Sequence, residues 1–190
     1  MHTPAPALVR QQTLAWLNNV VVGLNLCPFA RPVLAADTLR LEVVHGTDSD
    51  TLARSFLAEL DLLQKTQENA IATTLLVVPA GLESFDSYLD FVDLANDLIE
   101  QVGLLGTVQL ATFHPDYQFD GEPEGAVSHF TNRSPYPMLH LLREEMVEAA
   151  VAAHQDPDAI PLNNIARLEN LGREQVAALL QSAIDNSGEN

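Results

Sequence analysis

The chain has 190 residues, of which 47% are hydrophobic and 18% are charged, a composition typical of a folded globular protein rather than a disordered one. Nine basic residues stand against 26 acidic residues, which makes the protein strongly acidic with a formal net charge of −17. A negative field of this size repels phosphate backbones and anionic lipid surfaces, so we expect no nucleic-acid partner and no membrane partner. A small-molecule ligand remains compatible with this charge. The sequence does not specify an oligomeric state.

The cysteine content and the pattern of apolar residues indicate in which cellular compartment the protein resides. Cys27 is the single cysteine, which excludes an internal disulfide and is typical of proteins in a reducing cytoplasm. The N-terminal segment lacks a basic leader, and polar residues interrupt it at helical spacing, which argues against a signal peptide. No apolar run is long enough to span a bilayer. The sequence therefore predicts a cytoplasmic protein.

Apolar residues at helical spacing predict a first helix over residues 6–26, which Pro28 ends at or just after Cys27. Three strands rich in Val, Leu and Thr are then predicted, and they cover residues 38–45, 72–78 and 107–113.

Helical patterns fill the two gaps between these strands. Thr47 or Asp48 is the expected N-cap of the first of these helices, and Ser84 is the expected N-cap of the second. The order strand, helix, strand, helix, strand is typical of two crossover units in a parallel sheet. We therefore predict an α/β fold with a small, mainly parallel sheet of three or slightly more strands and helices packed on it.

The C-terminal third is predicted to be helical. A helix beginning near Tyr136 would bury Leu139, Leu142 and Met146, and a helical hairpin would follow. We expect a single α/β domain over residues 1–190, with a C-terminal helical appendage over residues 157–190.

Histidine and aspartate side chains follow the predicted strands at the edge where parallel sheets bind ligands. His45 comes after the first strand, and His114-Pro115-Asp116 comes after the third. A histidine oriented by an aspartate can act as a general base or as a metal ligand, so His114 and Asp116 are candidate catalytic residues. A divalent metal is a candidate cofactor, with His45, His129 or Cys27 as a third ligand. The alternative is that each histidine only hydrogen-bonds a loop.

Cys27 is a third candidate catalytic residue, as a nucleophile. A reactive thiol needs a lowered pKa, which a nearby histidine would supply. The C-terminal end of the predicted first helix would instead raise the thiol pKa. The alternative is a small core residue, as most lone cysteines are.

The segment Asn132-Arg133-Ser134 precedes the predicted helix at Tyr136 and is a candidate anion-holding group. Arginine offers two parallel donors to a carboxylate or phosphate, and the neighbouring amide and hydroxyl could add to them. Pro135 and Pro137 lack N–H groups, so the backbone contributes little to such a site. The alternative is that Arg133 pairs with an acid of the protein.

Three stretches of the sequence, LNLCPFA at 24–30, FHPDYQF at 113–119 and TNRSPYPMLHLLRE at 131–144, together resemble a bacterial family known as domain of unknown function 1415. The order of the predicted strands and helices is similar as well, so the resemblance covers most of the chain. It implies a soluble bacterial protein and assigns no activity, substrate or cofactor.

Two hypotheses follow. In the first, the protein is a small-molecule hydrolase or transferase, in which His114 and Asp116 carry the chemistry and Arg133 with Asn132 holds an anionic group of the substrate. Ser134 and His45 would be further ligand-binding residues. In the alternative, the protein is a non-catalytic regulatory module that binds a metabolite or a partner. Convergence of these side chains on one concave pocket would favour the enzyme.

Overall fold

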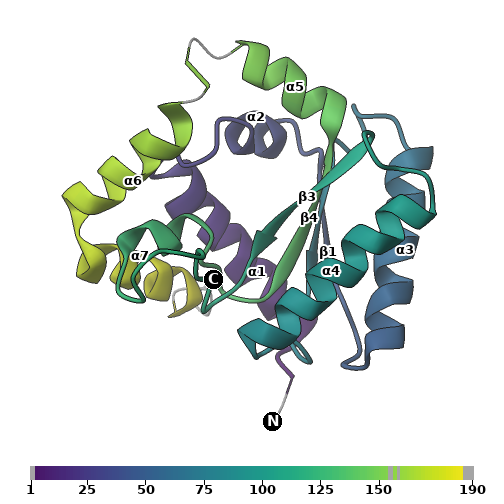
Figure 1. Ribbon diagram of the computed structural model, residues 1–190, viewed down its shortest axis with the longest axis horizontal. Helices are drawn as coiled ribbons and strands as arrows, with labels where there is room; N and C mark the ends of the chain where they lie inside the picture. The colour runs from purple at the N-terminus through teal and green to yellow at the C-terminus, as the bar shows by residue number, and fades with distance from the viewer. Residues whose placement is uncertain (1–2, 154–155, 158, 186–190) are drawn as a thin grey trace.

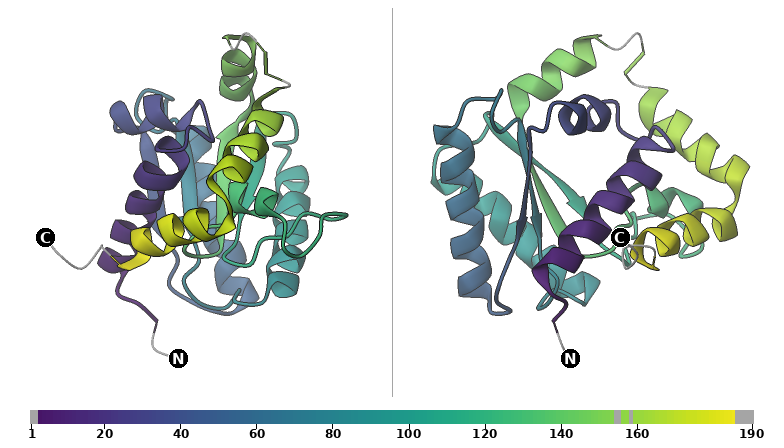
Figure 2. Two further views of the ribbon diagram at one scale, coloured as in Figure 1. Left: turned by 90° about the vertical axis from the view of Figure 1, so that its left-hand side faces the viewer. Right: turned by 180° about the vertical axis from the view of Figure 1, so that it is seen from behind.

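A four-stranded mixed sheet lies between two layers of helices in the computed structural model, which describes residues 3–153, 156–157 and 159–185 (Figure 1, Figure 2). The strands, in their order across the sheet, are β1 (Leu39–Val43), β2 (Thr73–Val77), β4 (Met138–Arg143) and β3 (Val108–Phe113). Strands β1 and β2 are parallel, whereas β4 is antiparallel to both of its neighbours. The predicted α/β class is confirmed.

The three predicted strands all form, and they run in the same direction because β4 reverses between β2 and β3. Helices α3 (Ser49–Lys65) and α4 (Phe85–Gln101) fill the gaps between them, as predicted. The side chain of Asp48 caps α3 by accepting a hydrogen bond from the backbone N–H of Thr51 at 2.9 Å. Ser84 occupies the N-cap position of α4 without a side-chain hydrogen bond.

The predicted helix near Tyr136 is wrong, because residues 138–143 form strand β4 and helix α5 (Glu144–Ala153) begins only after it. Strand β4 inserts between β2 and β3, and the helical layers cover both of its faces. A strand covered on both faces is apolar almost throughout and loses the alternation that identifies half-exposed strands. Leu139, Leu142 and Met146 then stand at intervals of three and four residues, which is the spacing expected of a helix although residues 138–143 form a strand.

The first helix also ends earlier than predicted. Helix α1 (Pro6–Trp16) continues into a π-helical segment, η1 (Leu17–Val22), and the next helix, α2, covers Ala30–Ala35. Cys27 therefore lies on the N-terminal side of α2 rather than at the end of the first helix, so the predicted rise of its pKa from that helix end does not apply. π-Helical turns are rare and are frequent at functional sites.

Two apolar cores lie on the two faces of the sheet. Helices α3 and α4 cover one face. The other face is covered by α1, η1 and α2, and the C-terminal pair α6 (Ala159–Leu171) and α7 (Arg173–Asp185) packs against α1, η1 and residues 127–131 on the outside of this layer (Figure 1). Val176 of α7 is fully buried in the same core as Trp16 of α1. The C-terminal helices thus share a core with the N-terminal helix, and residues 158 and 186–190 of the predicted appendage lie outside the described residues. None of the described helices is long and apolar enough to cross a membrane.

Candidate functional site

His45 and His114 lie at the same edge of the sheet, as their positions after strands of one direction predict. The register aligns Val43 of β1 with Phe113 of β3 across the two central strands. Strands β1 and β3 are the two outer strands, so three interstrand spacings separate them, which is about 14 Å. His45 is also exposed. The two histidines therefore share an edge but do not meet in one site.

His114 is fully buried, and both of its ring nitrogens are bound to the backbone. Nε2 donates to the carbonyl oxygen of Leu82 at 3.0 Å, and Nδ1 accepts from the N–H of Asp116 at 3.0 Å. The ring packs against Phe85 and Tyr88, with centroid distances of 5.2 and 5.0 Å. Burial lowers the pKa of His114, although its bond to Leu82 and the charge of Asp116 oppose this. The imidazole is thus neutral and has no free nitrogen for a substrate or metal.

The carboxylate of Asp116 is exposed and does not orient the imidazole, since the contact is made by its backbone N–H. His129 has a similar arrangement to His114: its Nδ1 accepts from Phe119 N–H at 3.1 Å, and its Nε2 donates to Pro123 O at 2.9 Å. These two hydrogen bonds of His129 stabilise the loop between Phe119 and Pro123. Within the described ranges, no group of three or more His, Cys, Asp or Glu residues is placed to hold a metal ion.

The side chains of Asn132 and Ser134 stabilise the conformation of their own segment. The amide of Asn132 donates to Thr112 O at 2.9 Å and accepts from the hydroxyl of Thr131 at 2.9 Å. The buried hydroxyl of Ser134 donates to Tyr136 O at 2.6 Å. These contacts leave little capacity for a ligand on either side chain.

Arg133 differs from its two neighbours. Its Nε donates to Tyr117 O at 3.3 Å, and its guanidinium carbon lies 4.7 Å from the centre of the Phe130 ring. No acid lies within ion-pair distance of it among the residues that the structure describes. The terminal nitrogens of a half-buried guanidinium therefore remain without a hydrogen-bond partner from the described chain.

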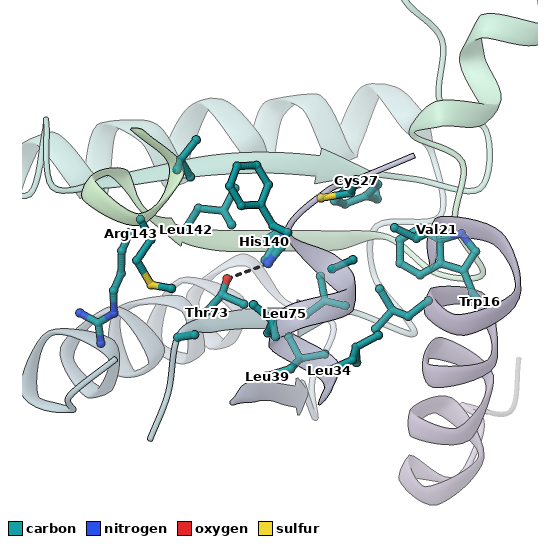
Figure 3. A pocket seen from close by; sticks show the side chains of 18 residues that line it. Trp16, Val21, Cys27, Leu34, Leu39, Thr73, Leu75, His140, Leu142 and Arg143 are labelled. Carbon is teal, nitrogen blue, oxygen red and sulfur yellow. Dashed lines mark hydrogen bonds between the residues drawn. The ribbon is translucent and has the colours of Figure 1, made fainter. Parts of the chain in front are cut away.

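A largely apolar cavity of about 90 Å³ lies between the sheet and the segment from α1 to α2 (Figure 3). The apolar side chains of its wall come from α1, η1, α2, the sheet and α5; they include Trp16, Val21, Leu34, Leu39, Leu75, Phe113, Leu142 and Val147. Three polar or ionisable side chains other than Arg143 also line it, namely Cys27, Thr73 and His140. The guanidinium of Arg143 is bound elsewhere, because it donates to three backbone carbonyls at the end of α3 and beyond.

The hydrogen bonds of Thr73 determine which nitrogen of His140 carries the proton. The single hydroxyl proton of Thr73 is donated to Leu141 O at 2.6 Å, since a carbonyl oxygen can only accept. The same hydroxyl lies 2.7 Å from Nε2 of His140, which must therefore be the donor (Figure 3). Nδ1 then carries a lone pair, and no described residue donates to it. Burial lowers the pKa of His140 to about 4, so the ring is neutral at pH 7.

Cys27 lines the same cavity as His140 (Figure 3). Burial raises the pKa of the Cys27 thiol, and hydrogen bonds from the backbone N–H groups of Phe29 and Ala30 oppose this rise in part. The thiol is thus protonated at neutral pH. Two donors at the start of a helix are nevertheless an arrangement that can stabilise a thiolate.

Sequence reasoning missed His140 and Thr73 as site residues. The available signal was a histidine inside an otherwise apolar run, Met138–Arg143. That run was assigned to a helix, so the side chains that share a sheet face with His140 could not be identified.

Comparison with known proteins gives one match. The model of a family described as "Protein of unknown function (DUF1415)" matches residues 8–178. No curated protein and no solved structure matches the chain. The matched range contains the whole cavity lining and both sheet-edge histidines.

Proposed function

The chain belongs to the family described as protein of unknown function (DUF1415), and from this premise we propose that it is a metabolite-binding protein. In this proposal the cavity between the sheet and helix α2 holds the apolar end of a small molecule. Of the two hypotheses drawn from the sequence, the non-catalytic module is the one that the site geometry supports better. His114, the predicted base, has both ring nitrogens bound to the backbone.

The observation that carries the proposal is the unpaired Nδ1 of His140 in the wall of an apolar cavity. His140 is half-buried, and a ligand that donates a hydrogen bond to this nitrogen beside an apolar wall gains about 0.5–1.5 kcal/mol. Thr73 fixes the ring so that this nitrogen can only accept a hydrogen bond. A ligand that donates a hydrogen bond, such as an alcohol, fits this nitrogen, whereas a carboxylate or a ketone does not.

The size of the cavity restricts the ligand further. A volume of about 90 Å³ is below the ~150 Å³ of an engineered apolar cavity that binds benzene, and far below the ~300 Å³ of small ligand pockets. It accommodates a short alkyl group, with the rest of a larger ligand outside. The π-helical segment η1 contributes Leu17 and Val21 to the wall, which agrees with the frequency of such turns at functional sites.

The test is a titration of the protein with short alcohols, with 1-butanol as the first probe. Binding is measured by the changes in the NMR chemical shifts of the backbone amides. We expect saturable shifts around α2 and β4. Replacing His140 by leucine should weaken 1-butanol binding about 2- to 10-fold, the value of one hydrogen bond. The same replacement should not weaken binding of butane, which has no hydroxyl.

A second experiment fills the cavity with a larger side chain and compares it with a control substitution outside the cavity. Ala30 lines the cavity from α2, whereas Ala35 of the same helix is exposed and does not. Ala30→Leu should remove the shifts caused by 1-butanol, and Ala35→Leu should leave them unchanged. Equal shifts in wild type and in Ala30→Leu would show that the alcohol binds elsewhere and would end the proposal.

A thiol-dependent acyl transferase or hydrolase is the second candidate, because Cys27 and the neutral His140 line one cavity. The sulfur would attack the carbonyl carbon of an ester, with His140 taking the thiol proton and passing it to the departing alcohol. Such a reaction requires a thiolate that forms readily near neutral pH.

Alkylation of Cys27 by iodoacetamide distinguishes the two candidates. Since burial raises the thiol pKa, we expect Cys27 to react more slowly than free cysteine at pH 7, with a rate that rises with pH well above neutrality. This result supports the binding module. A rate above that of free cysteine, lowered by His140→Gln, would support the enzyme instead; Cys27→Ala is the blank.

A further inference from the structure

Helix α6 lies beside the segment that joins η1 to α2 (Figure 1). Between them is a groove of about 780 Å³. This volume is within the range of roughly 300–1,000 Å³ that is typical of small-molecule sites. The groove shares no lining residue with the cavity that contains His140. It is therefore a second candidate binding site, and it does not depend on the proposed cavity function.

Hydrogen bonds between the two walls fix the shape of the groove. Nη1 of Arg167 donates to Leu24 O and, at 3.1 Å, to Asn25 O. Nδ2 of Asn164 donates to Leu26 O at 2.7 Å. The side chains of Arg167 and Asn164, which both line the groove, are thus held in place by the opposite wall. A site that is ordered before its ligand arrives has a lower entropic cost of binding.

Both of these side chains retain unused hydrogen-bonding capacity. No described residue accepts a hydrogen bond from Nε or Nη2 of Arg167, and no described acid lies within ion-pair distance of it. These two nitrogens lie on one edge of the guanidinium and can bind a carboxylate through two parallel hydrogen bonds. Asn164 is only 9% exposed, and no described residue donates to its Oδ1. The groove therefore offers a paired donor beside an acceptor.

The rest of the lining is suited to an uncharged body with one anionic group. Arg167 is the only charged side chain among the described residues that line the groove, although the chain has 26 acidic residues. Asn163 and Asn170 are four residues before and three residues after Arg167, so their amides lie on the same face of α6. The apolar part of the lining consists of Leu24, Pro28, Ile160, Ala166 and Leu171.

We propose that this groove binds an N-acylated amino acid. The carboxylate of this ligand binds Nε and Nη2 of Arg167, and its amide N–H donates to Oδ1 of Asn164. The two side chains are three residues apart on α6, with roughly 5–6 Å between their Cβ atoms, which suits a carboxylate and an amide that are joined by one carbon. A free amino acid fits less well, because its ammonium group would lie beside the guanidinium of Arg167.

The test measures dissociation constants by NMR titration of the wild-type protein with N-acetyl-leucine. We expect saturable shifts of the backbone amides of residues 23–28 and 160–171. N-acetyl-leucinamide, which lacks the carboxylate, should bind at least about 10-fold more weakly, since it loses hydrogen bonds to a charged group. 4-Methylpentanoate, which lacks the amide, should bind about 2- to 10-fold more weakly. Equal dissociation constants for N-acetyl-leucine and N-acetyl-leucinamide, or no saturable shifts, would overturn the proposal.

The same terminal groups occur in a free N-acylated amino acid and at the C-terminus of a peptide. N-acetyl-alanyl-alanyl-leucine distinguishes these two sources in the same titration. Tighter binding of this peptide than of N-acetyl-leucine assigns the groove to a peptide C-terminus, and equal or weaker binding assigns it to the free N-acylated amino acid.

A pair of matched substitutions tests the groove itself. Asn163→Asp places an acid four residues before Arg167 on α6, where it pairs with the guanidinium and repels the carboxylate of the ligand. Because Asn163 is exposed, the fold is retained, and we expect N-acetyl-leucine to bind about 2- to 5-fold more weakly. Asn96→Asp makes the same change at an exposed position of α4, on the other face of the sheet, and should bind as wild type does. Equal dissociation constants for the two variants would reject the groove as the binding site.

Discussion

Replacing His114 by alanine should lower the free energy of unfolding by about 3–5 kcal/mol, as expected for deletion of a buried aromatic ring and its hydrogen bonds. The ring fills the space against Phe85 and Tyr88 and ties the end of β3 to Leu82, in the segment before α4. Its loss would leave a cavity and free the Asp116 N–H. Chemical denaturation monitored by circular dichroism measures this change.

The matched control for this prediction is Asp116→Asn. The exposed carboxylate of Asp116 makes no hydrogen bond to the imidazole, so the control should stay within about 0.5 kcal/mol of wild type. A catalytic pair would behave differently: both variants would lose activity, and His114→Ala would keep most of its stability. A stable His114→Ala protein would therefore revive the His114 and Asp116 enzyme hypothesis.

Acid should destabilise the protein through His140, which is the second large effect. The pKa of this histidine is about 4 in the folded chain, compared with 6.5 for an unperturbed side chain. The folded state therefore binds fewer protons than the unfolded state between these values, so stability rises with pH in this window. The contribution of His140 is fully present above pH 6.5, falls by about 1.4 kcal/mol for each pH unit below it, and is lost by pH 4.

Comparison with His140→Gln isolates this contribution from that of the carboxylates, which both proteins share. Glutamine can still reach the hydroxyl of Thr73 and does not titrate. The stability of wild type relative to the variant should fall by about 3 kcal/mol from pH 6.5 to pH 4. Parallel stability curves for the two proteins would contradict the low pKa of His140.

The sequence determined the elements whose signals are local. Strands β1, β2 and β3 and helices α3 and α4 were predicted because their periodicity and their caps at Asp48 and Ser84 depend on nearby residues. It also placed His45 and His114 at one edge of the sheet, because strands of one direction end there together. The three stretches around Cys27, His114 and Arg133 identified the family.

Only the tertiary structure determined the position of β4, because its stability comes from pairing with β2 and β3, which are distant in sequence. Burial on both faces removed the alternation that would have identified it as a strand. This one misassignment concealed the site, since His140 enters the cavity only when Met138, His140 and Leu142 share a sheet face with Thr73. The hydrogen bond from His114 to Leu82 likewise joins distant segments, so local sequence patterns could not reveal which histidine is bound by the backbone and which faces a cavity.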